Sequence, residues 1–132
     1  MNLNKPLNAL LASVLGAGVL LTGAVNAQNY PDKPVTLVVP FAAGGPTDSI
    51  ARLIAVPMGK SLGQTVVVEN APGAGGTVAS NKVAKAKPDG YMIYIHHMGM
   101  ATAQALYDKL PYDPMKDFEY IGQVADVPMV LL

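Results

Sequence analysis

The chain has 132 residues, with nine basic side chains, nine acidic side chains, no cysteine and 51% hydrophobic residues. Charge is balanced and no run of like charge occurs, which argues against a basic nucleic-acid-binding surface, and we expect no nucleic acid or anionic membrane as a partner. Without cysteine, the chain forms neither disulfides nor thiolate metal sites, so an apolar core must stabilise it.

The first 27 residues have the pattern of a signal peptide. Lys5 precedes an uncharged apolar stretch at residues 9–21, which is too short to span a bilayer comfortably. Residues 25–27, Val-Asn-Ala, form a small-x-small cleavage motif. We therefore expect a signal peptide at residues 1–27, export to the periplasm and a mature chain that starts at Gln28. The alternative is an N-terminal membrane anchor.

Residues 28–132 suffice for one small domain or one lobe of a larger protein, but not for both. The last six residues, 127–132, are apolar and contain no turn or polar tail. We expect residues 28–132 to be the N-terminal ligand-binding lobe of a truncated chain, with a second lobe missing. Such a fragment should bind its ligand poorly.

The mature chain alternates strand and helix patterns. Apolar runs rich in β-branched residues predict buried strands at residues 34–40, 65–69 and 91–95. Apolar residues at three- and four-residue spacing predict helices at residues 47–62, 77–87 and 101–107. Residues 110–118 read as an irregular connection, and residues 119–125 and 127–132 as further strands. The chain is thus predicted to be an α/β protein with an open, mostly parallel sheet and helices on both faces.

Three residues set expectations for the first helix. Thr47 and Asp48 stand where an N-cap belongs. Pro57 lies inside the helical pattern and should kink or split the helix, because proline lacks the N–H and clashes with the preceding turn.

Two glycine-rich segments follow the first two predicted strands. Ligands of open parallel sheets gather at the carboxyl ends of the strands, where loops enter the N-termini of helices. Residues 44–48 and 73–77 should expose several backbone N–H groups there, and the helix dipole also favours an anion. We expect the two segments to hold one carboxylate between them. The alternative is that the glycines only permit tight turns.

Asp48 and the two histidines allow two interpretations each. Asp48 would serve as an N-cap or first-turn acid, or would contact an amino or hydroxyl group of a ligand. His96 and His97 follow a strand, where adjacent side chains point to opposite faces, so we expect no shared metal ion. One interpretation is that at least one histidine faces the crevice at the strand ends and donates a hydrogen bond to a carboxylate. The other is that both are simple strand-end polar residues.

Enzymatic motifs do not fit the sequence. Neither glycine-rich segment matches the phosphate-binding G-x-x-x-x-G-K-[ST] pattern, and the dinucleotide pattern fails at Val78. No G-x-S-x-G elbow occurs, and Ser49, Ser61 and Ser80 lie within helical patterns. We therefore expect a binding protein without a cofactor rather than an enzyme.

Six motifs, spread over most of the mature chain, carry a family resemblance. They are YPxKP at 30–34, VPFAAGGPTD at 39–48, LGQ at 62–64, VVENAPGAGG at 67–76, AKAKPDGY at 84–91 and LPYDPxKDF at 110–118. In this order they resemble the Bug family, the periplasmic solute receptors of tripartite tricarboxylate transporters.

The resemblance implies a two-lobed, type II-like α/β receptor, expected to be monomeric, that closes around a small organic carboxylate and works with membrane transporter subunits. In the family, loops that match residues 41–48 and 71–77 hold one ligand carboxylate, partly through bridging waters. The candidate ligand-binding residues, from the glycine-rich segments and from the resemblance together, are Phe41, Ala43, Gly44, Gly45, Thr47, Asp48, Gly73, Ala74, Gly75, Gly76, His96 and His97.

Two departures from the family pattern bear on geometry and ligand. Pro57 interrupts a helix that is usually continuous in the family, and residues 96–100, His-His-Met-Gly-Met, replace small, hydroxyl-rich residues. The bulky side chains would suit a larger or aromatic carboxylate. Two other functions stay open: an exported carboxylate-processing enzyme, and a subunit that presents its ligand to a signalling kinase.

The cleavage motif makes a direct prediction. The protein secreted to the periplasm should begin at Gln28, because a signal peptidase would cut after Ala27. Intact-mass spectrometry of the periplasmic protein checks this. A secreted protein that still carries Met1 would contradict it.

Overall fold

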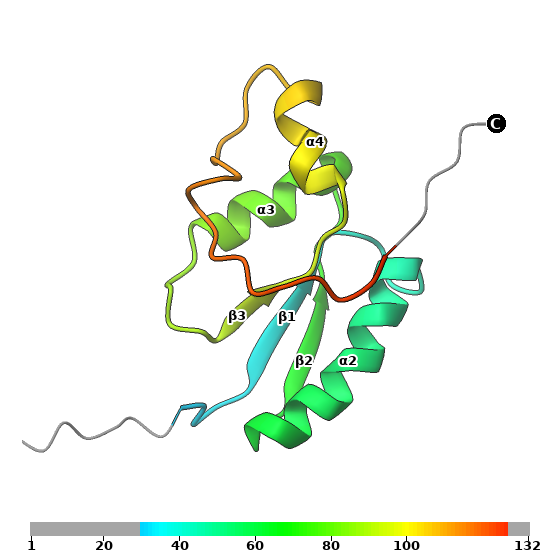
Figure 1. Ribbon diagram of the computed structural model, residues 1–132, viewed down its shortest axis with the longest axis vertical. Coiled ribbons are helices and arrows are strands. Elements are labelled where there is room, and N and C mark those ends of the chain that lie inside the picture. The colour runs from blue at the N-terminus through cyan, green and yellow to red at the C-terminus, as the bar shows by residue number, and fades with distance from the viewer. Residues whose placement is uncertain (1–29, 127–132) are drawn as a thin grey trace, which may run out of the picture.

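The computed structural model describes residues 30–126, in which strands and helices alternate (Figure 1). The strands are β1 (Val35–Val39), β2 (Val66–Asn70) and β3 (Met92–Tyr94). The helices are α2 (Pro46–Leu62), α3 (Thr77–Ala84) and α4 (Gly99–Leu106), and a short 3-10 helix, η1 (Ala74–Gly76), precedes α3. The predicted signal peptide and the predicted strand at residues 127–132 lie outside the described residues. Within residues 30–126, no helix combines the length and apolar character needed to cross a bilayer.

The three strands form one parallel sheet in the order β2-β1-β3. Val35 pairs with Val66 at one edge of β1, and Thr36 pairs with Met92 at the other. All three predicted strands are confirmed, with ends that differ by one residue. The parallel arrangement places all strand carboxyl ends at the same edge of the sheet.

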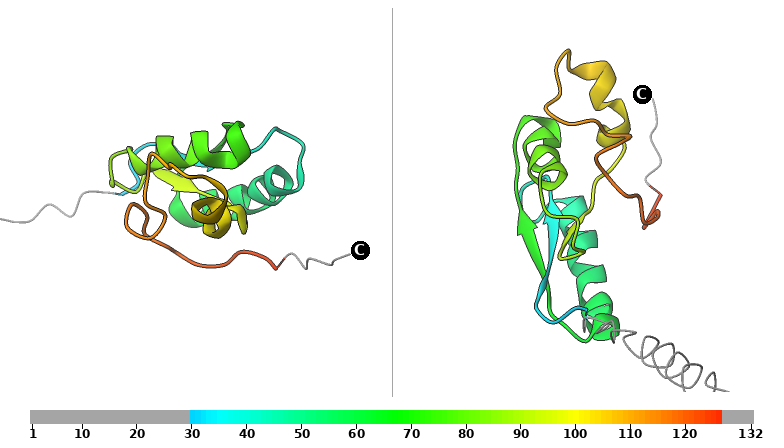
Figure 2. Two further views of the ribbon diagram at one scale, coloured as in Figure 1. Left: turned by 90° about the horizontal axis from the view of Figure 1, so that it is seen from above. Right: turned by 90° about the vertical axis from the view of Figure 1, so that its left-hand side faces the viewer.

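The central strand β1 is buried on both faces. Leu37 and Val39 form a core cluster with Ala51 of α2, while Val38, whose side chain points to the other face, is also fully buried. Helix α2 contacts β1 and β2, whereas α3 contacts β1 and β3. The connection from β1 to β2 and the connection from β2 to β3 lead in opposite directions across the sheet. Because such connections are right-handed, α2 and α3 cover opposite faces (Figure 2). The predicted sheet with helices on both faces is confirmed.

The start of α2 differs from the prediction. The N-cap is Gly45, without a side-chain cap, and Pro46 is the first helical residue, so the predicted N-cap at Thr47 or Asp48 is wrong. Proline suits this place because its fixed φ is helical and its missing N–H would have no intrahelical acceptor. Asp48 instead lies in the first turn of the helix.

Pro57 does not split α2, which continues to Leu62 and ends at Gly63 in the left-handed conformation. The expectation of two helical pieces is therefore wrong. Pro57 is exposed, and Leu53, whose carbonyl it leaves without its usual donor, is 74% exposed. Water can reach that side of the helix, which lowers the cost of the lost hydrogen bond.

Helix α4 begins two residues before the predicted start, at Gly99, whereas two other segments form less regular structure than predicted. Helix α3 ends at Ala84 rather than at Lys87, where the residue before Pro88 is biased away from helical conformation. The connection at residues 110–118 contains no helix or strand, as predicted. Residues 119–125 do not form the predicted strand and are exposed, because strand propensity without a hydrogen-bonding neighbour does not make a strand.

The core makes a stability prediction. Leu37→Ala should lower the free energy of unfolding by about 2–5 kcal/mol, because it opens a cavity around a side chain that is 1% exposed. Leu53→Ala, at a side chain that is 74% exposed, is the matched control and should change it by less than about 0.5 kcal/mol. Urea denaturation of the full-length protein measures both. Equal effects would contradict this placement of the core.

Candidate functional site

The carboxyl end of the sheet gathers the candidate residues. The starts of α2 and α3, together with α4, lie at the end toward which the strand arrows point (Figure 1). Residues 41–45 connect β1 to α2, residues 71–76 connect β2 to α3, and residues 95–98 connect β3 to α4. The topology thus brings all twelve predicted site residues to one edge of the sheet.

We call residues 41–48, which lead from β1 into the start of α2, the first turn. Some of its backbone amides have acceptors and others do not. Gly44 has a φ of +83°, and its N–H donates to Asp48 Oδ2 at 2.7 Å. The Gly45 N–H makes a long bond to the Ala42 carbonyl at 3.4 Å. Within residues 30–126, the amides of Thr47 and Asp48 have no backbone acceptor, as expected for the first turn of a helix. These two amides, rather than that of Gly44, are the donors that the first turn offers.

We call residues 71–77, which lead from β2 into the start of α3, the second turn, and it depends on left-handed backbone conformations. Gly73, Gly75 and Gly76 have φ values of +147°, +62° and +98°, and Ala74 lies between them at +43°. The Gly76 N–H donates to the Gly73 carbonyl at 2.9 Å. The backbone therefore does require glycine here, as the simpler interpretation holds. The amides of Gly73, Ala74 and Gly75 nevertheless lack an acceptor among residues 30–126, so both interpretations of this turn stand together.

Tyr107, at the end of α4, is a site neighbour that sequence reasoning missed. Its Oη donates to the Ala74 carbonyl at 3.2 Å and lies 2.6 Å from the position that a Cβ on Gly75 would take. No local pattern indicates this contact, because 33 residues separate the partners. Tyr107 covers one side of the second turn.

The sequence predicted that the two histidine side chains point to opposite faces, and this prediction is wrong. β3 ends at Tyr94, so the alternation of an extended strand does not extend to His96 and His97. Their ring centroids are 5.0 Å apart, and both rings contact Phe41: His97 is stacked on it at 4.6 Å, and His96 meets it edge-on at 5.6 Å. Phe41 thus joins the first turn to the segment after β3.

The hydrogen bonds of the histidines define which nitrogen is available. His96 Nδ1 accepts the His97 N–H at 2.7 Å, and His97 Nδ1 accepts the Gly99 N–H at 3.0 Å. In the neutral rings the proton is therefore on Nε2, which is free to donate. Burial, together with the neighbouring His97, lowers the pKa of His96 to about 4. His96 Nε2 lies 2.7 Å from the position of a Cβ on Gly76, so this donor reaches the second turn.

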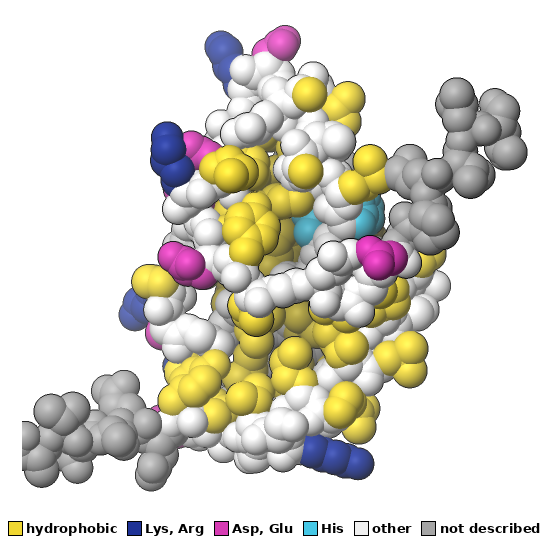
Figure 3. All heavy atoms as spheres, viewed as in Figure 1, with side chains coloured by type: hydrophobic (Ala, Val, Ile, Leu, Met, Phe, Trp, Pro, Cys, Tyr) yellow, Lys and Arg dark blue, Asp and Glu magenta, His cyan; other side chains and the backbone are white. Residues whose placement is uncertain are grey.

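A cluster of aromatic side chains extends from the histidines through Tyr94 to Phe118. Tyr94 contacts His96 edge-on at 5.4 Å and stacks on Phe118 at 6.1 Å. Its hydroxyl is hydrogen-bonded to Ser80 of α3 at 2.9 Å, and burial raises its pKa above the ordinary value. In Figure 3 the histidine side chains lie among hydrophobic ones. The candidate site therefore combines backbone donors with an apolar and aromatic wall.

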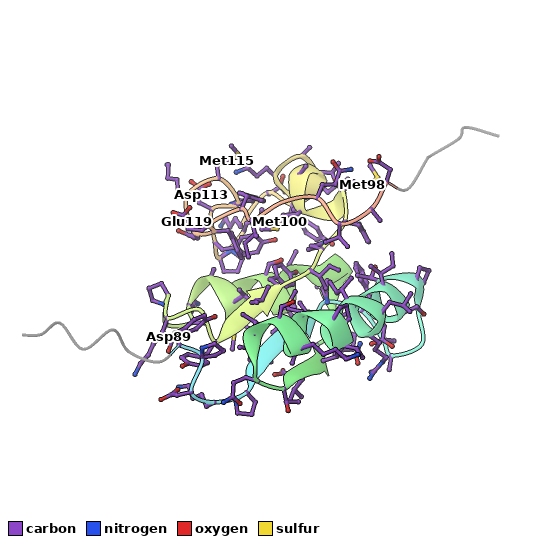
Figure 4. The ribbon with its side chains drawn as sticks, turned by 60° about the horizontal axis from the view of Figure 1, so that its bottom comes forward. Asp89, Met98, Met100, Asp113, Met115 and Glu119 are labelled. Carbon is purple, nitrogen blue, oxygen red and sulfur yellow. The ribbon has the colours of Figure 1, made fainter. Side chains whose placement is uncertain are left out.

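The methionines that depart from the family pattern have different surroundings. Met98 is 52% exposed, whereas Met100 is 8% exposed and contacts Ser80 Oγ through its sulfur. Figure 4 shows both where the chain enters α4. Of the two, only Met98 has the exposure that a ligand contact requires.

Asp48 does not extend into solvent. It is 2% exposed, and its carboxylate accepts hydrogen bonds from Gly44, from Arg52 and from Asn70. Thr47 is half-buried, and its hydroxyl has no hydrogen-bond partner among the described residues, while Ala43 is exposed. No group of three or more His, Asp or Glu residues within residues 30–126 is arranged to hold a metal ion.

A family model and several known proteins match this chain. The family model described as "Tripartite tricarboxylate transporter family receptor" matches residues 50–132. A UPF0065 protein of Agrobacterium vitis is 47% identical over 127 residues, which cover 96% of this chain and 37% of the relative. The protein BugT of Bordetella pertussis is 36% identical over 134 residues, covering 100% of this chain and 40% of the relative. The chain therefore spans less than half the length of these relatives.

Solved structures share the fold. The periplasmic binding protein BugD is 56% identical with a TM-score of 0.66, covering 68% of this chain and 30% of its own. MatC of Rhodopseudomonas palustris, solved with bound malate, is 52% identical with a TM-score of 0.65, covering 67% and 31%. A second R. palustris protein, solved with adipate, is 42% identical with a TM-score of 0.63, covering 65% and 29%. The architecture is thus that of part of a periplasmic binding protein, and the chain belongs to the tripartite tricarboxylate transporter receptor family.

Proposed function

We propose that this chain supplies one lobe of a periplasmic receptor that captures a small organic carboxylate for a tripartite tricarboxylate-type transporter. One observation carries the proposal: two glycine-containing turns and the Nε2 donor of His96 meet at one edge of the sheet. Open amides at helix starts favour an anion both through hydrogen bonds and through the helix dipole.

The ligand class follows from the chemistry of the donors and of the wall. Amides of Thr47, Asp48 and Gly75 are neutral donors in fixed positions, which suit a carboxylate oxygen. Phe41 and His97 add a flat surface beside them, suited to the carbon skeleton of the acid. Malate and adipate in the two similar R. palustris structures belong to this class. In the proposed receptor, a second lobe closes over the ligand and completes its selectivity.

Calorimetric titration of the full-length protein tests the function. Malate, adipate and benzoate represent short, long and aromatic acids, and succinamide, the uncharged diamide of a four-carbon acid, is the control. At least one acid should bind, and the diamide should not, because the site is built for an anion. Binding of none of the acids, or equal binding of the diamide, would contradict the proposal.

Two substitutions locate the site. Thr47→Ala leaves the backbone donors in place and should cost about 1 kcal/mol or less of binding free energy. Gly75→Val should reduce affinity far more, since a valine at φ +62° is strained and its Cβ meets Tyr107. Tyr107→Phe, which removes that oxygen, controls for the tyrosine contact when combined with Gly75→Val. Circular dichroism must show folded variants, and wild-type affinity in folded Gly75→Val would exclude this turn from the site.

The state of His96 makes a pH prediction. The unfolded chain takes up a proton at this residue near pH 6.5, whereas the folded protein does so only near pH 4. The free energy of unfolding should therefore fall as the pH drops from 6.5 to 4, and this contribution is fully present above 6.5. His96→Gln, which keeps a neutral donor, should show a smaller fall. Urea denaturation at several pH values measures both, and parallel curves would contradict a neutral, packed His96.

A further inference from the structure

A buried carboxylate joins three parts of the candidate site. Asp48 Oδ2 accepts the Gly44 N–H at 2.7 Å and Arg52 Nε at 2.9 Å, and Asp48 Oδ1 accepts Asn70 Nδ2 at 2.9 Å. Gly44 belongs to the first turn, Arg52 to α2, and Asn70 is the last residue of β2. One carboxylate thus receives donors from the first turn, from the helix that follows it and from the strand that leads into the second turn.

Asn70 makes the connection two-sided. Its Nδ2 also donates to the Phe41 carbonyl at 3.1 Å, and its Oδ1 accepts Arg52 Nη2 at 3.2 Å. The Ala71 N–H, next in the chain, donates to the Val39 carbonyl at 2.8 Å. The start of each turn is therefore hydrogen-bonded to the end of the strand that precedes the other turn.

The same contacts direct the amides. Because the Gly44 N–H is bonded to the carboxylate, it is not available to a ligand, and the chain must reach Pro46 through a left-handed Gly44. The amides of Thr47 and Asp48 follow directly, at the start of the helix. Their direction depends on a turn that the carboxylate holds in place.

Charge supports the same role. An unpaired acidic side chain among the hydrogen-bond donors of an anion site would repel a carboxylate ligand. Hydrogen bonds from Arg52 first, then from Gly44 and Asn70, lower the pKa of Asp48 to about 2, so the group stays ionised. Arg52, one turn further along α2, supplies the compensating positive charge. All of the contacts of the carboxylate are internal, and its side chain is 3% exposed.

We propose that Asp48 and Asn70 are positioning residues for carboxylate capture: their side chains fix the two glycine-containing turns relative to each other and do not themselves contact the ligand. This role rests on the function proposed above. Of the two interpretations that the sequence left open for Asp48, it favours an acid in the first turn of the helix over a side-chain contact with the ligand.

The test uses the full-length protein, with malate as the probe. Asp48→Asn keeps the size of the side chain but introduces an NH2 group among three donors, so malate affinity should fall on the order of tenfold or more. Glu119→Gln, at an exposed acid in the connection after α4, is the matched loss of charge and should bind as wild type (Figure 4). The double variant Asp48→Asn/Asn70→Asp restores one carboxylate and one amide in exchanged places and should recover part of the affinity.

A spectroscopic readout separates positioning from general stability. The Gly44 amide proton, bonded to a carboxylate, should resonate downfield in wild type, move upfield in Asp48→Asn and return partly in the double variant. Wild-type malate affinity in folded Asp48→Asn would overturn the proposal. So would a loss of affinity in Asp48→Asn without a shift of the Gly44 amide proton, since that result indicates direct contact by the Asp48 side chain. If wild type binds no malate, the proposed function fails for this acid, and an unchanged Gly44 resonance in Asp48→Asn would still overturn the positioning role.

Discussion

The burial of β1 on both faces is the constraint on which the rest of the structure depends. A central parallel strand must be covered by a helix on each side, and the crossovers on its two sides meet this need with α2 and α3. The same topology delivers the turns after β1, β2 and β3 to one edge of the sheet. Core packing, carried by Leu37, Val38 and Val39, therefore also places the turns of the candidate site.

The hydrogen bonds at that edge divide the backbone amides of the two turns into bonded and open ones. A helix start leaves amides without intrahelical acceptors, and a protein must satisfy them internally, with water or with a ligand. Here the Gly44 and Gly76 amides are satisfied internally, by Asp48 and by the Gly73 carbonyl. The division between bonded and open amides gives the site rigidity together with unfilled donors. In the proposed role, Asp48 provides the rigidity, while the cation of Arg52 would limit its repulsion of a bound anion.

Local patterns predicted most of the fold. The β-branched runs are strands, and the apolar spacing of residues 47–62 is a helix, because burial and periodicity act within a few residues. The same reasoning failed where the outcome depends on what lies opposite. Residues 119–125 have strand propensity but no partner strand within residues 30–126, and Pro57 is tolerated because its side of α2 is exposed.

The candidate site could be predicted only in outline. Glycine at turns after parallel strands indicated Gly44, Gly45 and the second turn, since backbone conformation there depends on local sequence. The contact of Tyr107 with the second turn depends on tertiary structure, as does the shared packing of His96 and His97 on Phe41. Sequence also gave no sign that Asn70 would bond to Asp48 across 22 residues.

Chemical-shift mapping of backbone amides tests the central claim, that open amides at two turns hold one carboxylate. The isotope-labelled full-length protein is titrated with the acid that binds best in calorimetry. We expect the largest changes among residues 30–126 at Thr47, Asp48 and residues 73–75, with smaller changes at the amides that already have internal acceptors. The largest changes in the cleft lined by Gln104, Tyr107, Asp108, Leu110, Tyr112 and Asp113, with none at the two turns, would contradict the account.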